Sequence, residues 1–136
     1  MSDPGSAAGD SAAEAAEVGW GIGIDLIEIS RIERALERQP GLANRLFRPE
    51  ELAYARSGSR PAQHLAARFA AKEAAVKALG ADSIAFREIE VVAGEPPTLR
   101  LHGKAASVAR ERGIKLGVSL THSRELAAAV VRADPA

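Results

Sequence analysis

The 136-residue chain contains no cysteine, which excludes disulfide bonds, thiolate nucleophiles and cysteine-ligated zinc sites. It also lacks an apolar run near the roughly 20 residues of a membrane-spanning helix, and residues 1–17 have neither the basic residue nor the apolar core of a signal peptide. The 18 basic and 18 acidic residues sum to zero net charge, so bulk electrostatic binding to nucleic acid or membrane is not indicated. We therefore expect a cytoplasmic protein that binds neither.

The composition is that of one globular domain with a real core, because 46% of the residues are hydrophobic and 26% are charged. Residues 1–17 differ from this average, since they are rich in Ala, Gly and Ser and carry four acidic residues without a basic one. Such a segment rarely buries enough apolar surface to fold. We predict a disordered leader over residues 1–17 and a single domain over residues 18–133.

Turn and cap residues divide the domain into expected helices and strands. Residues 18–27 alternate Gly with Val, Trp and Ile, which predicts a buried strand whose backbone is closely approached by a neighbour. Ser30 is a candidate N-cap for a short helix that Pro40 and Gly41 stop. Further helices are expected at residues 49–56, 61–79 and 104–112, and further strands at residues 86–94, 97–103, 114–123 and 125–132. Strands that follow helices without regular alternation indicate an α+β fold.

The long helix over residues 61–79 breaks one rule of amphipathic helices. Its apolar stripe spans an arc of about 80° and comprises Leu65, Phe69, Val76 and Leu79. Lys72 projects into the middle of this stripe and Glu73 onto its edge. Buried charges are expensive, so we interpret this edge of the helix as the border of a polar cleft rather than of a dry core.

Three other residues stand out against apolar surroundings: Asp25, Lys77 and His122. Singly, each has an ordinary explanation: a helix cap for Asp25, a surface i,i+4 pair with Glu73 for Lys77, and a hydrogen-bonded core histidine for His122. With Lys72 and Glu73 they make two carboxylates, two amines and an imidazole. Mg²⁺ prefers carboxylate and phosphate oxygens, and cations stabilise charge on a leaving phosphate. The set therefore suggests a metal and pyrophosphate site.

Three segments carry a resemblance to a known family. "GIGIDLIEISRIERAL", "RFAAKEAAVKALG" and "VSLTHS" resemble the signature blocks of the holo-acyl-carrier-protein synthase family, the small-type 4′-phosphopantetheinyl transferases, and the match runs from Gly21 to Arg132. The resemblance implies an α+β 4′-phosphopantetheinyl transferase fold, a small antiparallel sheet packed against a long helix, and a homotrimer with active sites between subunits. It also implies transfer of 4′-phosphopantetheine from coenzyme A to a serine of apo acyl carrier protein, with release of adenosine 3′,5′-bisphosphate.

Site residues follow from the matched positions. The resemblance implies that Asp25 and Glu73 hold Mg²⁺ as the cofactor. Glu73 would also act as the general base for the carrier serine, Lys77 as the acid or electrostatic partner of the leaving phosphate, and His122 as a contact of the pyrophosphate. The coenzyme A-binding set is Arg68, Lys72, Lys77 and His122.

Residues 31–60 carry a local excess of positive charge, with seven Arg against four Glu. On charge alone this is either a solvated helix face or a docking surface for an acidic partner. The resemblance favours docking of an acidic carrier protein on Arg31, Arg38 and Arg45, although the sequence does not say whether the carrier is of the fatty-acid or the polyketide type.

Two positions depart from the family pattern. The usual G-[KR]-P turn reads Gly94, Glu95, Pro96, which reverses a charge near the coenzyme A end of the cleft. Ser123 follows His122 where some members carry Asp, so no mechanism that uses that Asp can operate. The alternatives to an enzyme are a non-catalytic carrier-protein-binding module with the same fold and a plain nucleotide-binding protein.

Overall fold

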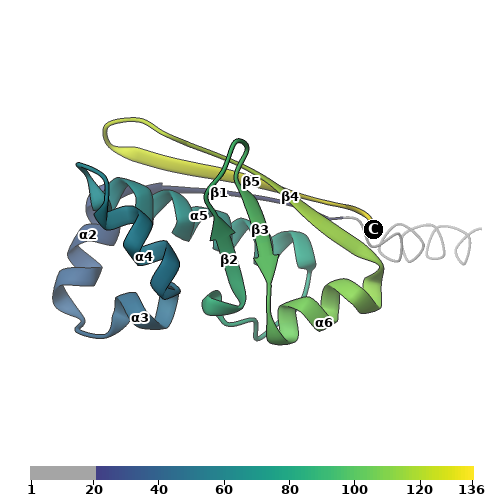
Figure 1. Ribbon diagram of the computed structural model, residues 1–136. Coiled ribbons are helices and arrows are strands. Elements are labelled where there is room, and N and C mark those ends of the chain that lie inside the picture. The colour runs from purple at the N-terminus through teal and green to yellow at the C-terminus, as the bar shows by residue number, and fades with distance from the viewer. Residues whose placement is uncertain (1–20) are drawn as a thin grey trace, which may run out of the picture.

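The computed structural model describes residues 21–136, shown in Figure 1. The leader predicted for residues 1–17 and the first three residues of the domain predicted for 18–133 lie outside this range. Two antiparallel sheets and five α-helices make up the described part of the chain. The three-stranded sheet has the order β1-β5-β4, with bounds Ile22–Glu28, Leu126–Pro135 and Ile114–His122, and the two-stranded sheet pairs β2 (Ile89–Val92) with β3 (Thr98–Leu101). The helices are α2 (Ile29–Arg38), α3 (Leu42–Leu46), α4 (Pro49–Arg56), α5 (Pro61–Leu79) and α6 (Gly103–Arg112), with a short 3₁₀ turn at Phe86–Glu88.

Helix α5 is the centre of the fold. It begins with Pro61 in its first turn and ends at Gly80, whose φ of 65° is the left-handed conformation typical of a helix end. The three-stranded sheet covers one side of it, and α2, α4 and β2 contact it from other directions (Figure 1). Burial on several sides is possible because the helix presents small side chains, and its buried alanines are Ala66, Ala67, Ala70, Ala71, Ala74, Ala75 and Ala78.

Strand β1 lies directly against the backbone of α5. A Cβ atom at Gly23 would collide with the carbonyl oxygen of Ala74, and one at Gly21 with that of Ala78. Only glycine allows this approach, so the predicted close approach to the strand is confirmed. The prediction that the strand is buried was wrong for its other face, where Ile22, Ile24 and Leu26 are exposed. Strand β1 then presents alternate residues to the helix, which places Asp25 on the same face as Gly23 and Ile27.

The other face of the three-stranded sheet is apolar and uncovered. Ile22, Ile24 and Leu26 of β1 are 70%, 67% and 64% exposed, and Leu126 of β5 is also exposed. We call the face formed by these four residues the outer sheet face. An alternating strand normally places polar residues on its solvent side, so this face has the composition of a contact surface.

The α+β architecture with a small antiparallel sheet on a long helix is confirmed. Two local predictions were wrong or incomplete. Helix α2 already begins at Ile29, with Glu28 as the preceding cap residue, so Ser30 lies inside the helix and is not its N-cap. Helix α3, five residues long, was not predicted because it is too short for a periodic signal. No helix within residues 21–136 is long and apolar enough to cross a membrane.

Candidate active site

Asp25, Glu73 and Lys77 meet where β1 crosses α5. The Lys77 ammonium donates a hydrogen bond of 2.9 Å to the carbonyl oxygen of Ile24. It also lies 3.7 Å from Oδ1 of Asp25. Glu73 precedes Lys77 by one helical turn, so both side chains lie on the helix face that β1 approaches. The structure thus brings these three predicted site residues together.

Glu73 has a shifted pKa within this cluster. Burial raises the pKa of Glu73, the negative charge of Asp25 raises it further, and Lys77 partly opposes both effects. Glu73 therefore holds a proton more readily than an exposed glutamate does. Raised carboxyl pKa values beside a second carboxylate are typical of sites that bind a cation or move a proton.

A surface cavity of about 420 Å³ opens beside the two carboxylates. Asp25, Glu73 and Arg31 form its polar rim, and its walls are apolar. The wall residues are Leu26, Ile27, Ile32, Ala35, Leu42, Leu46 and Phe69. This cavity is large enough for an extended side chain or an acyl-chain-like arm rather than for water alone.

The donor set at this cavity suits Mg²⁺. No cluster of three or more His, Cys, Asp or Glu with metal-binding geometry occurs in the described part of the chain. Asp25 and Glu73 nevertheless give two hard oxygen donors on the same cavity. Mg²⁺ commonly takes one or two protein carboxylates and completes its shell with water and phosphate oxygens. The two residues therefore fit this ion if a phosphate substrate supplies further oxygens.

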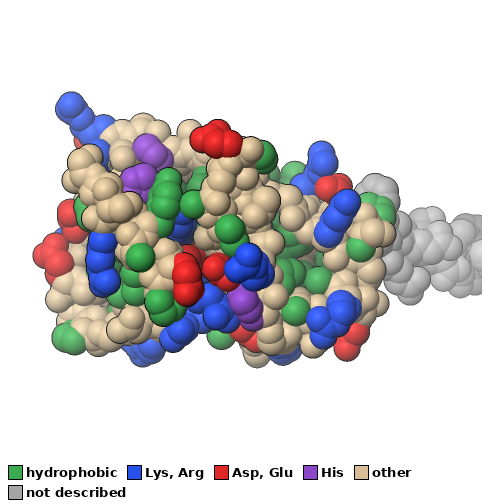
Figure 2. All heavy atoms as spheres, viewed as in Figure 1, with side chains coloured by type: hydrophobic (Ala, Val, Ile, Leu, Met, Phe, Trp, Pro, Cys, Tyr) green, Lys and Arg blue, Asp and Glu red, His purple; other side chains and the backbone are tan. Residues whose placement is uncertain are grey.

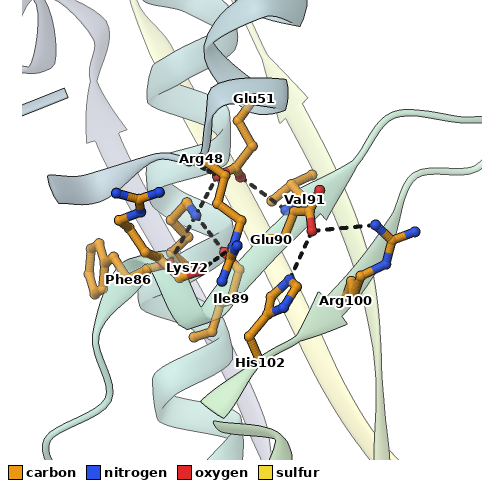
Figure 3. A network of polar contacts seen from close by, with 10 residues as sticks. Arg48, Glu51, Lys72, Phe86, Ile89, Glu90, Val91, Arg100 and His102 are labelled. Carbon is orange, nitrogen blue, oxygen red and sulfur yellow. Dashed lines mark hydrogen bonds and ion pairs between the residues drawn. The ribbon is translucent and has the colours of Figure 1, made fainter. Parts of the chain in front are cut away.

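Lys72 does not join the cluster, and Figure 3 shows why. Its side chain is fully buried, with 0% exposed, and its ammonium forms an ion pair of 2.9 Å with Oε1 of Glu51 in α4. It also donates hydrogen bonds to the carbonyl oxygens of Phe86 and Ile89. All three ammonium protons are therefore used within the protein.

Both carboxylate oxygens of Glu51 also have hydrogen-bond donors within the protein. Oε1 of Glu51 also accepts the backbone N–H of Arg48 at 2.8 Å, and its Oε2 accepts the backbone N–H of Val91 at 3.0 Å. We call Glu51 and Lys72 the buried pair. The interpretation that Lys72 borders a polar cleft is wrong, because its ammonium lies in the packed interior between α4, α5 and β2. The same burial contradicts its assignment to coenzyme A.

Arg68 lies one helical turn before Lys72 and is also buried, with only 4% exposed. Its guanidinium carbon lies 4.3 Å from the centre of the Tyr54 ring. Its Nε is a buried donor for which residues 21–136 supply no hydrogen-bond acceptor. A buried donor without an acceptor is unusual in a core, so Arg68 fits a site that receives an anion.

His122 ends β4 and lies away from the carboxylates of its own chain. The sheet register aligns Asp25 with Ala129 and Leu120, and Ile27 with Ala127 and His122. His122 is therefore two strands across and two residues along from Asp25, a backbone separation of about 12 Å. It also lines a smaller cavity of about 170 Å³ together with Leu26 and Leu126, at the border of the outer sheet face.

Two neighbours of His122 and Arg68 were missed at the sequence level. The His64 ring lies 6.2 Å from that of His122 and 5.4 Å from that of Tyr54, centre to centre, in edge-to-face geometry. Burial lowers the pKa of His64, and the charges of Arg68 and His122 lower it further. His64 precedes Arg68 by four residues, so their common helix face was readable, but the contacts to α4 and β4 were not.

The predicted docking arginines are on the surface. Arg31, Arg38 and Arg45 are exposed, and none of them forms an ion pair with another described residue. Arg31 also lines the cavity beside Asp25 and Glu73. Positive charge without an internal partner is therefore available next to the carboxylate cluster.

A further polar cluster lies on β2 and β3 and was not predicted. Glu90 is buried and pairs with Nε2 of His102 at 2.9 Å and with the Arg100 guanidinium at 3.5 Å. Figure 2 shows acidic, basic and histidine side chains side by side in the middle of the face of the molecule that is turned toward the viewer. The cluster is internally paired and lies next to the buried pair (Figure 3), which indicates a structural role.

Comparisons with known proteins agree on one group. The family model for the 4′-phosphopantetheinyl transferase superfamily matches residues 21–131. The chain is 48% identical to a holo-[acyl-carrier-protein] synthase of Moorella thermoacetica over 113 residues, which cover 79% of this chain and 88% of that protein. It is 45% identical to the corresponding synthase of Clavibacter michiganensis subsp. michiganensis over 115 residues, with 82% and 92% covered.

Solved structures show the same similarity. The coenzyme A complex of the synthase of Chronobacterium ammoniagenes has a TM-score of 0.77 at 29% identity and covers 86% of this chain and 98% of its own. The acyl carrier protein synthase of Mycobacterium tuberculosis has a TM-score of 0.70 at 35% identity, with 85% and 97% covered.

Proposed function

This chain belongs to the 4′-phosphopantetheinyl transferase superfamily, and we propose that it is a holo-[acyl-carrier-protein] synthase. It transfers 4′-phosphopantetheine from coenzyme A to a serine of apo acyl carrier protein. The serine oxygen forms a bond to the β-phosphorus of coenzyme A, the bond from that phosphorus to the bridging oxygen breaks, and adenosine 3′,5′-bisphosphate leaves. The observation that best supports the proposal is that Asp25, Glu73 and Lys77 lie close together beside a cavity.

Positioning and charge neutralisation do most of the work in phosphoryl transfer. Glu73 accepts the serine proton, directly or through a water, and its raised pKa matches that task better than an exposed carboxylate would. Lys77 faces the same region and is oriented by its hydrogen bond to Ile24. Its positive charge stabilises the leaving phosphate.

Asp25 and Glu73 would also hold the magnesium ion that the reaction requires. The ion would supply positive charge that stabilises the pyrophosphate oxygens. Burial and then the negative charge of Asp25 raise the pKa of Glu73, so a site with these two carboxylates favours a bound cation.

The acyl carrier protein docks on the basic side of α2 and α3 in this proposal. Arg31, Arg38 and Arg45 are exposed and without acidic partners among the described residues. An acidic carrier would supply those partners and would be steered toward them electrostatically. Because Arg31 lies on the cavity rim, docking there would bring the carrier serine toward Glu73.

We further propose that the enzyme works as a homotrimer with shared active sites. In a single chain the backbone of His122 lies about 12 Å from that of Asp25. The outer sheet face is apolar, and the cavity of His122 borders it. A neighbouring subunit packed on this face would bury Ile22, Ile24 and Leu26. It would also allow His122 and Arg68 of one subunit to face the carboxylate cluster of the next.

The departure at Glu95 lies in the exposed turn between β2 and β3, where it forms no ion pair with another residue of 21–136. It therefore adds an unpaired negative charge on that side of the protein.

The cytoplasmic location expected from the sequence stays a prediction.

A direct assay tests the function. The protein is incubated with coenzyme A, Mg²⁺ and an apo carrier protein, and mass spectrometry follows the carrier. We expect a gain of one phosphopantetheine that disappears with excess chelator and in the Glu73→Ala variant. Stable complex formation with the carrier but no mass gain would instead identify a non-catalytic binding module.

A further inference from the structure

Four side chains from three elements form a continuous stack next to the proposed coenzyme A site. The Arg68 guanidinium lies over the face of Tyr54 at 4.3 Å. Tyr54 meets His64 edge-to-face at 5.4 Å, and His64 meets His122 edge-to-face at 6.2 Å. Helix α4, helix α5 and strand β4 are thereby linked through rings in geometries that favour aromatic and cation–π contacts.

The backbone around the stack is constrained as well. Gln63 donates a hydrogen bond of 3.1 Å to the carbonyl oxygen of Ser123, and Arg60 donates one of 3.1 Å to that of Arg124. Both acceptors follow His122 directly, so the first turn of α5 holds the end of β4. The His64 ring also rests on Gly58, where a Cβ atom would lie 2.8 Å from its Nε2. The imidazole of His64 is therefore confined between α4 and His122.

Charge also favours this arrangement. Burial, and then the neighbouring Arg68 and His122, lower the pKa of His64, so its ring loses a proton more readily than that of an exposed histidine. The His64 ring therefore fills the space between Tyr54 and His122 with little tendency to add positive charge. The buried Nε of Arg68 has no hydrogen-bond acceptor within residues 21–136, which leaves this donor without the partner that a buried polar group normally has.

We propose that Tyr54 and His64 are positioning residues that hold the Arg68 guanidinium and the His122 imidazole together as one anion-binding unit for coenzyme A. This inference rests on the proposed function, because it assigns the unit to that substrate. Neither Tyr54 nor His64 lines the cavity beside Asp25 and Glu73, so their effect is on binding of coenzyme A rather than on proton transfer or carrier docking.

Matched variants separate ring packing from other effects. Tyr54→Leu removes the aromatic face, and Tyr54→Phe keeps it; His64→Ala removes the ring next to His122. We expect Tyr54→Leu and His64→Ala to raise the Kd for coenzyme A by calorimetry, and its KM, about 2- to 30-fold, the range of one lost cation–π or aromatic contact. Tyr54→Phe should stay within about twofold of the native protein, and the KM for carrier protein should stay within about twofold in all three.

Histidine ring signals in NMR spectra give a second readout that does not depend on turnover. The chain has three histidines, and His102 pairs with Glu90 away from the stack, so it serves as an internal control. Coenzyme A should shift the signals of His64 and His122 but not those of His102. His64→Ala should move the His122 signals even without ligand, because the ring current of His64 is lost.

Native mass spectrometry and thermal melts confirm assembly and folding of each variant before it is scored. If Tyr54→Leu does not fold, His64→Ala decides alone, because its side chain is only half-buried. Unchanged coenzyme A affinity in folded His64→Ala, or equal weakening in Tyr54→Phe and Tyr54→Leu, overturns the inference while leaving the proposed function intact. If the native protein neither binds coenzyme A nor modifies the carrier, the proposed function itself fails, and the inference fails with it.

Discussion

Replacement of Lys72 by methionine tests the structural reading of the buried pair. The substitution keeps much of the side-chain volume but leaves the Glu51 carboxylate buried without its counter-ion. Removing one partner of a buried ion pair costs about 3 to 5 kcal/mol. A domain has about 5 to 15 kcal/mol of total stability, so we expect Lys72→Met to lower the free energy of unfolding by a large fraction and Tm by about 12 to 20 °C.

A double variant provides the matched control. Glu51→Gln together with Lys72→Met removes both charges, while the glutamine oxygen can still accept the N–H of Val91. We expect it to recover at least half of the stability lost in Lys72→Met, because no uncompensated charge remains. Urea unfolding of the native protein, Lys72→Met and the double variant is compared at one protein concentration, since assembly would otherwise change the apparent stability.

The same double variant also tests what Lys72 does for the substrate. The ammonium of Lys72 is fully buried, and its three hydrogen bonds go to Glu51, Phe86 and Ile89. KM for coenzyme A should therefore change less than about threefold in a folded double variant. Loss of a direct contact worth about 1.4 kcal/mol would raise it roughly tenfold. Two results would refute the reasoning: a loss of stability below about 1 kcal/mol in Lys72→Met, or a tenfold loss of coenzyme A affinity in the stable double variant.

Four further outcomes are expected. Glu73→Gln should abolish transfer yet raise Tm at neutral pH. The reason is that the pKa of Glu73 is raised in the folded state, so its ionised form destabilises the fold at neutral pH. The gain in Tm should vanish below pH 4.5, the ordinary pKa of the group, because Glu73 is then protonated in both the folded and the unfolded state. Gly23→Ala should unfold or strongly destabilise the protein in urea, since its Cβ would collide with the carbonyl of Ala74. Arg31→Glu should raise KM for the carrier far more than for coenzyme A, and rising salt should mimic it, whereas equal effects on both would place Arg31 in the cleft. Mixtures of the inactive variants His122→Ala and Glu73→Ala should regain activity after subunit exchange, which native mass spectrometry verifies. In a cyclic assembly, about a quarter of random interfaces join a native His122 from one subunit to a native Glu73 from its neighbour. Exchanged mixtures that stay inactive would place the site within one chain.

Local signals predicted most of the helices and strands. Pro61 and Gly80 mark the ends of α5, and the structure places them at its first turn and its C-cap. The glycines of β1 predicted close backbone contact, which the approach of Gly23 to α5 confirms. These predictions succeeded because cap and turn residues act through their own backbone conformation. Helix α3 was missed because it is too short for a periodic signal. The start of α2 was misplaced because the N–H of Ile29 bonds to the carbonyl oxygen of Glu125, a contact that only the fold creates.

Within the candidate site, the sequence singled out Asp25, Glu73 and Lys77, which the structure brings together, but it misjudged the surroundings of Lys72. The reason is that the partner of Lys72, Glu51, lies 21 residues away in another helix. In the sequence, a lysine that is buried in an ion pair and a lysine that borders a cleft look the same: each is a single charge within the apolar stripe of a helix. The stack of Tyr54 and His64 was missed for the same reason, because its contacts join three elements that only the fold brings together.

The neighbouring residues Lys72 and Glu73 show how one helix serves both stability and chemistry. Successive residues of an α-helix point about 100° apart, so the two charges enter different environments. Lys72 points into the interior, where Glu51 neutralises it, and its hydrogen bonds to Phe86 and Ile89 fix α5 against the segment that leads into β2. Glu73 faces the cavity beside Asp25, where nothing neutralises it fully and its pKa is raised. Because the buried pair anchors α5 one residue before Glu73, the position of this carboxylate is fixed by an ion pair in the interior, away from the cavity.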